Sequence, residues 1–298
     1  MGHGALVVTP EMVAGLRSQL SDQDNKDCDD AMAHRYLCAV SGDTKKAAHR
    51  VQLSLAWQRR VQPGKVVCKA CAADPKSHYM QVVGFCKLQR PVFYSCMALS
   101  PNKVTEHGRD HLITKFEQAI RMMPADGLQQ WIWVSDFHGF GVADLSPAMA
   151  REFLDISAMH YPERLGVYLL VDTPKIFEAL WTIVRPMVDP VTAKKLKFVT
   201  YDVKSKTKGA KLRASLAELF DSDLVEWLIH EMKDNRESGQ KGKKFFDVPQ
   251  TYSKACQGDL DVPVGHDLRG TARVFKMYLD NPSLLLPQAQ ATLAEAGQ

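Results

Sequence analysis

The sequence predicts an α/β domain with a largely parallel sheet, preceded by a helical region. From about Gln81 to Tyr201, short apolar runs typical of strands alternate with segments of helical periodicity, a pattern that indicates a layered α/β domain. Residues 11–60 show helical spacing only. The chain has 298 residues, 45% of them apolar and 24% charged, so it can form one large domain, or one domain with a smaller helical companion.

The helical region is predicted to contain two helices with a break between them. Asp29 and Asp30 can cap a helix through residues 31–40, whose apolar side chains fall along one face. The polar stretch at 41–44 interrupts this helix and caps a second one, which ends near Arg60.

The remaining elements follow in order along the chain. The predicted strands are 82–85, 91–97, 131–134, 167–171 and 196–201. The predicted helices are 110–123, one that opens at Ser146-Pro147, 174–188 and 224–232. Residues 236–298 begin with a linker-like stretch rich in glycine and lysine, and we interpret them as an extension of the domain.

The helix at 174–188 is unusually apolar for a protein without a membrane span. Its polar residues form one narrow stripe, made of Lys175, Glu178, Thr182 and Arg185. Two interpretations remain open for such a helix. It is either a core helix between the sheet and another layer, or a movable lid that covers an apolar cavity and meets lipid when it moves.

The ends of this helix carry their own signals. Asp172 and Thr173 can cap it, and Pro174 suits its first turn, where a missing N–H costs nothing. Pro186 removes a backbone hydrogen bond and should loosen the last turn. A loosened end slightly favours the movable lid.

The segment after this helix is locally basic. Residues 194–213 contain eight Lys and Arg side chains against one acid, Asp202. These side chains either belong to a solvated loop, or form a surface that meets anionic phospholipid. Near such a membrane each basic side chain contributes on the order of 1 kcal/mol.

Common enzyme motifs are missing from the sequence. It contains no GxSxG turn and no phosphate-binding GxxxxGK[ST] or GxGxxG loop. Residues 136–139 have the DxxG shape of GTPases, but no phosphate loop accompanies them. We therefore predict no catalytic residue and no enzymatic activity. The net charge of +4 is mild, so we predict no nucleic-acid binding either.

Cys68 and Cys71 form a lone CxxC pair. A zinc site needs a second pair or histidines at ligand spacing, and His78 lies seven residues on, but no matching pair follows in the sequence. We interpret the CxxC as incidental, with metal or redox chemistry as the alternative, and predict neither a metal nor a cofactor.

The cellular setting is predicted from cysteines and apolar stretches. Seven scattered cysteines fit free thiols in a reducing compartment. The sequence shows no secretory signal, and no apolar stretch reaches the roughly 18 residues that a bilayer span needs. We expect a cytoplasmic protein that touches membranes peripherally.

A block of short motifs runs through residues 160–196. It comprises Tyr-Pro-Glu-Arg-Leu-Gly at 161–166, Asp-Thr-Pro at 172–174, Arg-Pro at 185–186 and Asp-Pro-Val-Thr-Ala-Lys-Lys-Leu at 189–196. It is preceded by Arg-Pro-Val at 90–92 and by the D-x-x-G of 136–139. Together these segments resemble the CRAL-TRIO lipid-binding family, whose members include phosphatidylinositol/phosphatidylcholine transfer proteins and carriers of tocopherol and retinal. The similarity covers about residues 25–235.

The resemblance implies the CRAL-TRIO fold, in which a mainly parallel sheet floors an apolar pocket and a gating helix closes it. It divides the chain into an all-helical N-terminal subdomain at 11–65, a lipid-binding domain at 75–235, and a linker with a C-terminal extension at 236–298. The gating helix is expected to include Pro174, Leu180 and Val184. The expected pocket lining is Trp131, Trp133, Phe177 and Trp181.

The resemblance also implies headgroup residues. In the phosphatidylinositol-binding branch, a Thr and a Lys of the D-P-x-T-x-x-K segment contact the inositol phosphate, and Thr192 and Lys195 occupy these positions. Glu163 of the Y-P-E-R segment matches a residue close to the same headgroup. Ser157 matches a serine that helps to hold the choline lipid.

Two departures from the branch bear on the ligand. Val40 and Ser41 stand where the branch has an Arg-Lys pair near the inositol phosphate. Trp131 and Trp133 stand where it has two hydroxyl residues for the phosphocholine phosphate, and this change disfavours phosphatidylcholine in the usual pose.

We therefore predict a non-enzymatic protein that binds a hydrophobic ligand and transfers or presents it at anionic membrane surfaces. The leading ligand is a phospholipid such as phosphatidylinositol. The membrane-facing basic residues are expected to be Lys194, Lys197, Lys204, Lys206 and Lys208. Two alternatives remain open: a carrier of an isoprenoid or tocopherol-type ligand, and a protein-interaction module of the same fold that binds small GTPases or other regulators.

Overall fold

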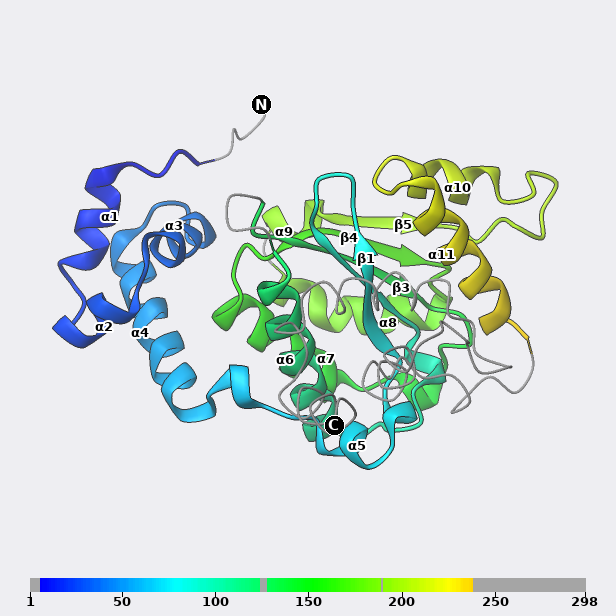
Figure 1. Ribbon diagram of the computed structural model, residues 1–298, viewed down its shortest axis with the longest axis horizontal. Coiled ribbons are helices and arrows are strands. Elements are labelled where there is room, and N and C mark those ends of the chain that lie inside the picture. The colour runs from blue at the N-terminus through cyan, green and yellow to red at the C-terminus, as the bar shows by residue number, and fades with distance from the viewer. Residues whose placement is uncertain (1–5, 124–127, 189, 238–298) are drawn as a thin grey trace, which may run out of the picture. The chain divides into compact units, whose positions relative to one another are not determined.

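The computed structural model describes residues 6–123, 128–188 and 190–237 (Figure 1). Their contacts divide them into two compact units. The helical unit takes the chain up to Val66 together with Arg151–Arg164, and the sheet unit takes Val67–Ala150 and the chain from Leu165. The predicted extension at 236–298 lies outside the described residues except for its first two, Arg236 and Glu237.

The helical unit is built from short capped helices. Its elements are α1 (Pro10–Arg17), α2 (Asp22–Asp27), α3 (Asp30–Ala39), α4 (Thr44–Val61) and the later part of α7 (Pro147–His160). The Asp29 carboxylate accepts the Met32 N–H at the start of α3, and Asp43 accepts the Lys46 N–H at the start of α4, which are side-chain caps of the usual kind. The two predicted helices and the break between them are confirmed.

The segment 151–164 packs against α3 and α4. The Tyr36 hydroxyl donates to the Met159 carbonyl at 2.8 Å, and the Trp57 indole stacks on the His160 ring at a centroid distance of 4.0 Å. The ring of His160 also hydrogen-bonds the Ser54 hydroxyl at 3.2 Å. The predicted boundaries did not separate this segment from the lipid-binding domain, because its partners lie about a hundred residues earlier in the chain.

The sheet unit contains one five-stranded sheet with the order β1-β2-β3-β4-β5. The strands are β1 (Met80–Phe85), β2 (Pro91–Ser95), β3 (Trp131–Asp136), β4 (Leu165–Val171) and β5 (Leu196–Val199). The first pair is antiparallel and the other three pairs are parallel. The predicted α/β class with a largely parallel sheet is confirmed.

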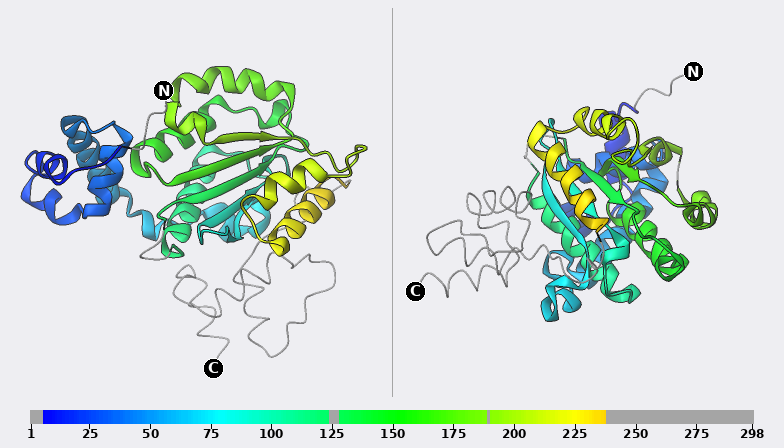
Figure 2. Two further views of the ribbon diagram at one scale, coloured as in Figure 1. Left: turned by 90° about the horizontal axis from the view of Figure 1, so that it is seen from above. Right: turned by 90° about the vertical axis from the view of Figure 1, so that its right-hand side faces the viewer.

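The connections between strands decide which helices lie on which face. Because β2 to β5 are parallel and adjacent in chain order, right-handed crossovers place the connecting helices on one face. These include α6 (Thr105–Arg121) and α8 (Lys175–Val184), while α10 (Ala210–Ala217) and α11 (Ser222–Asn235) cover the opposite face (Figure 2). On that opposite face, Ile132 and Val134 pack in one core with Trp227.

The remaining elements are short. They are α5 (Lys69–Ala73), α9 (Pro190–Lys194) and the 3₁₀ turns η1 (Pro63–Lys65), η2 (Pro75–Ser77), η3 (Met97–Leu99), η4 (Val142–Asp144) and η5 (Arg185–Met187). Among the described residues, every helix is too short or too polar to cross a bilayer.

One predicted boundary differs clearly from the structure. Helix α6 begins at Thr105 rather than at Asp110. Its N-cap residue, Val104, offers no side-chain acceptor, so the usual sequence signal for a helix start is missing. The Val104 N–H is instead bound by the Asn102 side chain at 3.0 Å.

Candidate functional site

Helix α8 begins differently from the expectation. The predicted caps were Asp172 and Thr173, with Pro174 in the first turn, but Pro174 is the N-cap residue and no side chain caps the helix. The Asp172 carboxylate is used elsewhere, since it accepts the Tyr201 N–H and lies 3.3 Å from the Arg236 guanidinium. Pro174, expected within the gating helix, therefore precedes it.

Helix α8 has one buried side and one exposed side, both apolar. Leu180 and Val184 are buried, at 9% and 7% exposed. Phe177 packs against Phe137 at a centroid distance of 4.7 Å. On the outer side Ile183 is 47% exposed. A core helix between two layers would bury that residue, so α8 is a surface helix of the sheet unit. Whether it moves as a lid stays a prediction.

The end of α8 matches the effect expected of Pro186. The α-helix stops at Val184 and continues as the 3₁₀ turn η5, because a proline cannot donate the next helical hydrogen bond. The Arg185 guanidinium donates to the Val188 carbonyl at 3.2 Å and closes this turn. Apolar side chains remain exposed beyond it, with Met187 at 36% and Val191 at 53%.

A line of hydroxyl groups crosses the sheet face on the α6 and α8 side. The Trp133 indole N–H donates to the Ser95 hydroxyl at 2.9 Å, and Ser95 and Ser135 share a hydrogen bond of 2.8 Å. Ser135 continues to the Tyr168 hydroxyl at 2.9 Å. Burial raises the pKa of Tyr168 to about 12, so it stays a neutral hydroxyl group.

This hydroxyl line was not predicted, although the sequence carries a signal for it. Ser95 and Ser135 lie two residues after Phe93 and Trp133 on neighbouring strands, and side chains two apart share a face of the sheet. The family motifs assigned Trp131 and Trp133, and not the serines, to this face. The face therefore keeps hydroxyl donors despite the two indoles.

The four predicted lining residues divide between the sheet and α8. Trp131 is 2% exposed and stacks on Phe116 of α6 at 4.3 Å, so it forms part of the core. Trp133 is half-buried and lies 5.4 Å from the Tyr168 ring. Phe177 and Trp181 sit on α8 with their rings 6.4 Å apart.

The predicted headgroup residues fall in both units. The Thr192 carbonyl accepts the Lys195 N–H at 2.9 Å and so forms a turn. The Lys195 carbonyl in turn accepts the Tyr168 N–H at 2.9 Å. These contacts tie both residues to the edge of the sheet. Ser157 and Glu163 belong to the helical unit, where the Ser157 hydroxyl donates to the Phe153 carbonyl at 2.6 Å. The headgroup role of all four remains a prediction.

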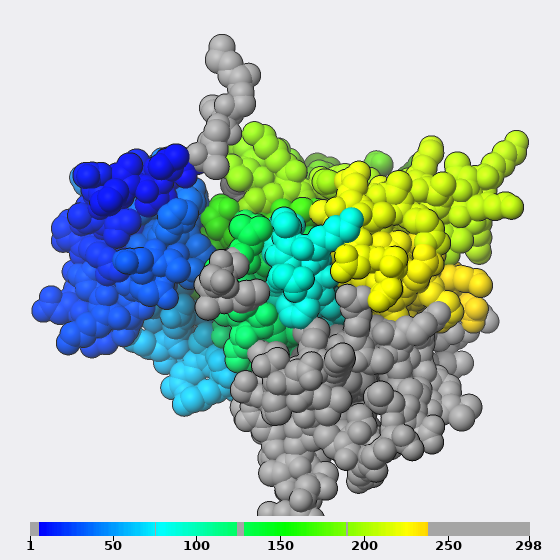
Figure 3. Space-filling view, turned by 45° about the horizontal axis from the view of Figure 1, so that its top comes forward, coloured from blue at the N-terminus to red at the C-terminus, as the bar shows by residue number. Residues whose placement is uncertain are grey.

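The predicted basic residues lie at the surface of the sheet unit. The exposed side chains are those of Lys194, Lys197, Lys204, Lys206 and Lys208. Lys197 faces Glu218 at 3.4 Å. Figure 3 shows the yellow-green segment around residues 200–210, which carries the last three lysines, standing out from the sheet unit.

Asp202 links the start of this basic loop to its end through hydrogen bonds. Its buried carboxylate accepts hydrogen bonds from the Thr207 hydroxyl and from the N–H groups of Lys211 and Leu212. The hydrogen bond from Thr207 lowers the pKa of this carboxyl group. The single acid in the basic segment therefore shapes the loop that presents the lysines.

Other motif residues have structural roles. Asp136 accepts the His138 N–H at 3.0 Å, and Gly139 has a φ of +73°, a conformation that favours glycine. A side chain at Gly166 would lie 2.5 Å from the Arg90 guanidinium and 3.2 Å from the Trp131 carbonyl. The D-x-x-G, R-P-V and Y-P-E-R-L-G motifs thus shape strand ends and strand packing.

Comparison with known proteins agrees with this architecture. The CRAL/TRIO domain profile matches residues 77–224. A CRAL-TRIO domain-containing protein of Schizosaccharomyces pombe is 27% identical over 165 residues, which are 55% of this chain and 16% of that protein. The phosphatidylinositol transfer protein PDR17 of Saccharomyces cerevisiae is 25% identical over 177 residues, 55% of this chain and 50% of that protein.

A third relative is the phosphatidylinositol transfer protein CSR1 of Eremothecium gossypii. It is 27% identical over 187 residues, which are 57% of this chain and 43% of that protein. This chain therefore spans half or less of the length of these relatives. The profile match runs from η2 into α11 and includes the whole sheet, α8 and the basic loop. The chain belongs to the CRAL-TRIO domain family.

Proposed function

We propose that this chain binds a phospholipid, with phosphatidylinositol as the leading ligand, between α8 and the sheet face that carries Trp133, and that it transfers or presents this lipid at membranes. The observation that carries the proposal is the surface helix α8, which buries Leu180 and Val184 and exposes Ile183. A helix with apolar side chains on both sides can cover acyl chains when closed and contact a bilayer when it moves.

The acyl chains would obtain their affinity from apolar contact. Burying one chain contributes about 0.8 kcal/mol per methylene, and the aromatic rings of Phe177, Trp181 and Trp133 provide surface for it. Polar groups then select the headgroup, because an unpaired buried phosphate is costly. No catalytic step is part of this function.

The headgroup proposal rests on two sets of groups. Thr192 and Lys195 supply a hydroxyl and an ammonium group beside the edge of the sheet, as in the phosphatidylinositol-binding branch. The hydroxyls of Ser95, Ser135 and Tyr168 form a hydrogen-bonded line on the sheet face. Two relatives named phosphatidylinositol transfer proteins support the same headgroup.

The membrane surface is proposed to be anionic and the contact peripheral. The loop held by Asp202 presents three lysines, each worth on the order of 1 kcal/mol near an anionic surface. The exposed Ile183, Met187 and Val191 provide apolar contacts for the interface. Positive charge and exposed apolar side chains are the two features that interfacial membrane binding uses.

A vesicle-to-vesicle transfer assay tests the headgroup proposal. With fluorescent phosphatidylinositol we expect Lys195→Ala to lower the transfer rate severalfold, because the cation that faces the phosphate is lost. Lys45→Ala, which removes an exposed lysine of the helical unit, is the matched control and should transfer normally. An equal loss with a neutral lipid would count against headgroup recognition by Lys195.

A second candidate is supported by the tight aromatic packing on the sheet face. The rings of Phe93, Phe116 and Trp131 lie within 5.9 Å of one another, and Trp133 adds bulk beside them. Such packing would also fit a module that keeps the fold and binds protein regulators at its surface. Purified protein that carries no lipid but captures a stoichiometric protein partner would favour this candidate.

A further inference from the structure

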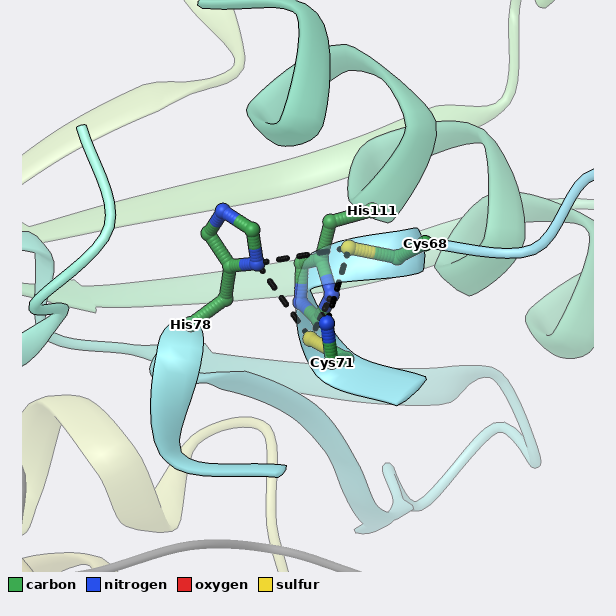
Figure 4. Close-up of side chains that lie close together, drawn as sticks. All are labelled: Cys68, Cys71, His78 and His111. Atoms are coloured by element: carbon green, nitrogen blue, oxygen red, sulfur yellow. Dashed lines mark hydrogen bonds between the residues drawn. The ribbon is translucent and has the colours of Figure 1, made fainter. Parts of the chain in front are cut away.

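Four side chains of the kinds that bind metals meet beside the edge strand β1, and none of them comes from α8 or from the hydroxyl line. Cys68 precedes α5 and Cys71 lies within it, His78 follows η2, and His111 comes from α6 (Figure 4). Their ligand atoms all lie within 4.8 Å of one another. Figure 4 shows the four side chains pointing toward a common centre.

We propose that Cys68, Cys71, His78 and His111 bind a single Zn²⁺ ion as a structural site. Structural zinc is held by four Cys and His ligands in tetrahedral geometry. Zn–S bonds of about 2.3 Å and Zn–N bonds of about 2.0–2.1 Å at the tetrahedral angle place sulfur and nitrogen about 3.5 Å apart.

The observed distances agree with this geometry. The Cys71 Sγ lies 3.3 Å from the Nδ1 atoms of both His78 and His111, and the Cys68 Sγ lies 3.5 Å from the His78 Nδ1. A two-iron cluster with two cysteines and two histidines would place the pairs on different metal atoms. Sulfur and nitrogen would then lie farther apart than they do, so the geometry indicates one ion.

Neighbouring backbone groups are arranged as zinc sites require. The Nε2 atom of His111 lies 3.1 Å from the Met80 carbonyl, which holds the proton on Nε2 and leaves Nδ1 free to bind metal. The Cys71 N–H donates to the Cys68 sulfur at 3.5 Å, and such a hydrogen bond stabilises a thiolate. Cys68 and His111 are buried, at 3% and 6% exposed, which favours a permanent ion over an exchangeable one.

The proposed ion would fasten parts of the sheet unit together. It would join the segment 68–78, which enters β1, to helix α6, which packs on the sheet. The complete set of four protein ligands leaves no position for water or substrate, so the site would stabilise the fold and not catalyse a reaction. The site is independent of the lipid proposal, because none of its ligands belongs to α8 or to the hydroxyl line.

Metal analysis of the untagged full-length protein tests this proposal. After expression in medium that contains zinc and purification without chelator, we expect inductively coupled plasma mass spectrometry to find about one zinc ion per chain. Cys71→Ser and His111→Gln should each lower this ratio at least fivefold. The matched control is Cys38→Ser, and this variant should keep its zinc. Cys38 lies 3.6 Å from His34 on α3, but among the described residues this pair belongs to no group of three or more possible metal ligands.

A second measurement, cobalt spectroscopy, uses the wild-type protein and so needs no variant to fold. Cobalt substituted into the wild-type protein should show the intense visible absorption of a tetrahedral site together with thiolate charge-transfer bands. Four results would overturn the proposal: less than about a tenth of a zinc ion per chain, a disulfide between Cys68 and Cys71, iron with labile sulfide, or a weak octahedral cobalt spectrum.

Discussion

Replacing Arg236 with methionine should destabilise the sheet unit strongly. The Arg236 side chain is 6% exposed and forms hydrogen bonds of 2.7 and 3.0 Å with Asp136, whose side chain is fully buried. The same guanidinium lies 3.3 Å from Asp172 and 3.6 Å above the ring of Tyr201. It therefore joins the end of β3 to the segments that follow β4 and β5.

The size of the effect follows from the charge that is left behind. Methionine keeps most of the apolar volume but leaves the Asp136 carboxylate buried without its cation, and breaking a buried ion pair in this way costs about 3–5 kcal/mol. Arg213→Met is the control, because Arg213 and its partner Glu226 are both exposed, at 47% and 60%. An exposed pair contributes less than about 1 kcal/mol.

Urea unfolding followed by tryptophan fluorescence measures both losses. A double variant, Asp136→Asn with Arg236→Met, should recover part of the stability, because it removes the charge that the single variant leaves unpaired. A loss below about 1 kcal/mol for Arg236→Met, or no recovery in the double variant, would refute the proposed role of this ion pair.

Three further outcomes are expected. Changing Lys204, Lys206 and Lys208 to glutamine should weaken binding to anionic vesicles by about 3 kcal/mol, roughly 100-fold, in a sedimentation assay. Unchanged binding would contradict the proposed membrane surface. Burial lowers the pKa of His160 to about 4. Its contribution to stability is therefore present above pH 6.5 and lost as the pH falls through 4. Because the ring is partly exposed, the loss should be about 1 kcal/mol. In acid unfolding curves His160→Gln should abolish this loss, whereas the control His49→Gln, at an exposed histidine, should keep it. Removing the proposed zinc with a strong chelator should lower the melting temperature by several degrees in calorimetry, and an unchanged melting temperature would argue against a structural role.

Elements defined by local patterns were predicted well. Asp29 caps α3 as expected, and the apolar runs of β2, β3 and β4 form adjacent strands of the sheet. The change from α-helix to 3₁₀ turn after Val184 agrees with the loosened last turn that Pro186 predicts. These features depend on residues within a few positions of one another, which is the range over which caps, alternation and proline act.

Features that depend on distant partners were not predicted. Asp172 was expected to cap α8, but Arg236 and the Tyr201 N–H engage its carboxylate. Arg236 itself was assigned to the extension, because nothing near it in sequence signals a buried ion pair. Such tertiary contacts override local preference.

The candidate sites follow the same division. The resemblance identified Thr192 and Lys195, and their headgroup role remains to be tested. The hydroxyl line was not predicted, because the meeting of its hydroxyl groups depends on how β2, β3 and β4 pair. The CxxC pair was interpreted as incidental because only His78 follows it closely in sequence. The fold brings in His111 from α6 to complete the set, a contact that spacing alone does not reveal.

Native mass spectrometry of the freshly purified full-length protein, combined with lipid extraction, tests phospholipid binding most directly. We expect the protein to carry about one lipid molecule per chain, with phosphatidylinositol enriched over its share in the host membranes. Protein that carries no lipid, and that acquires none when incubated with phosphatidylinositol vesicles, would contradict the proposed function.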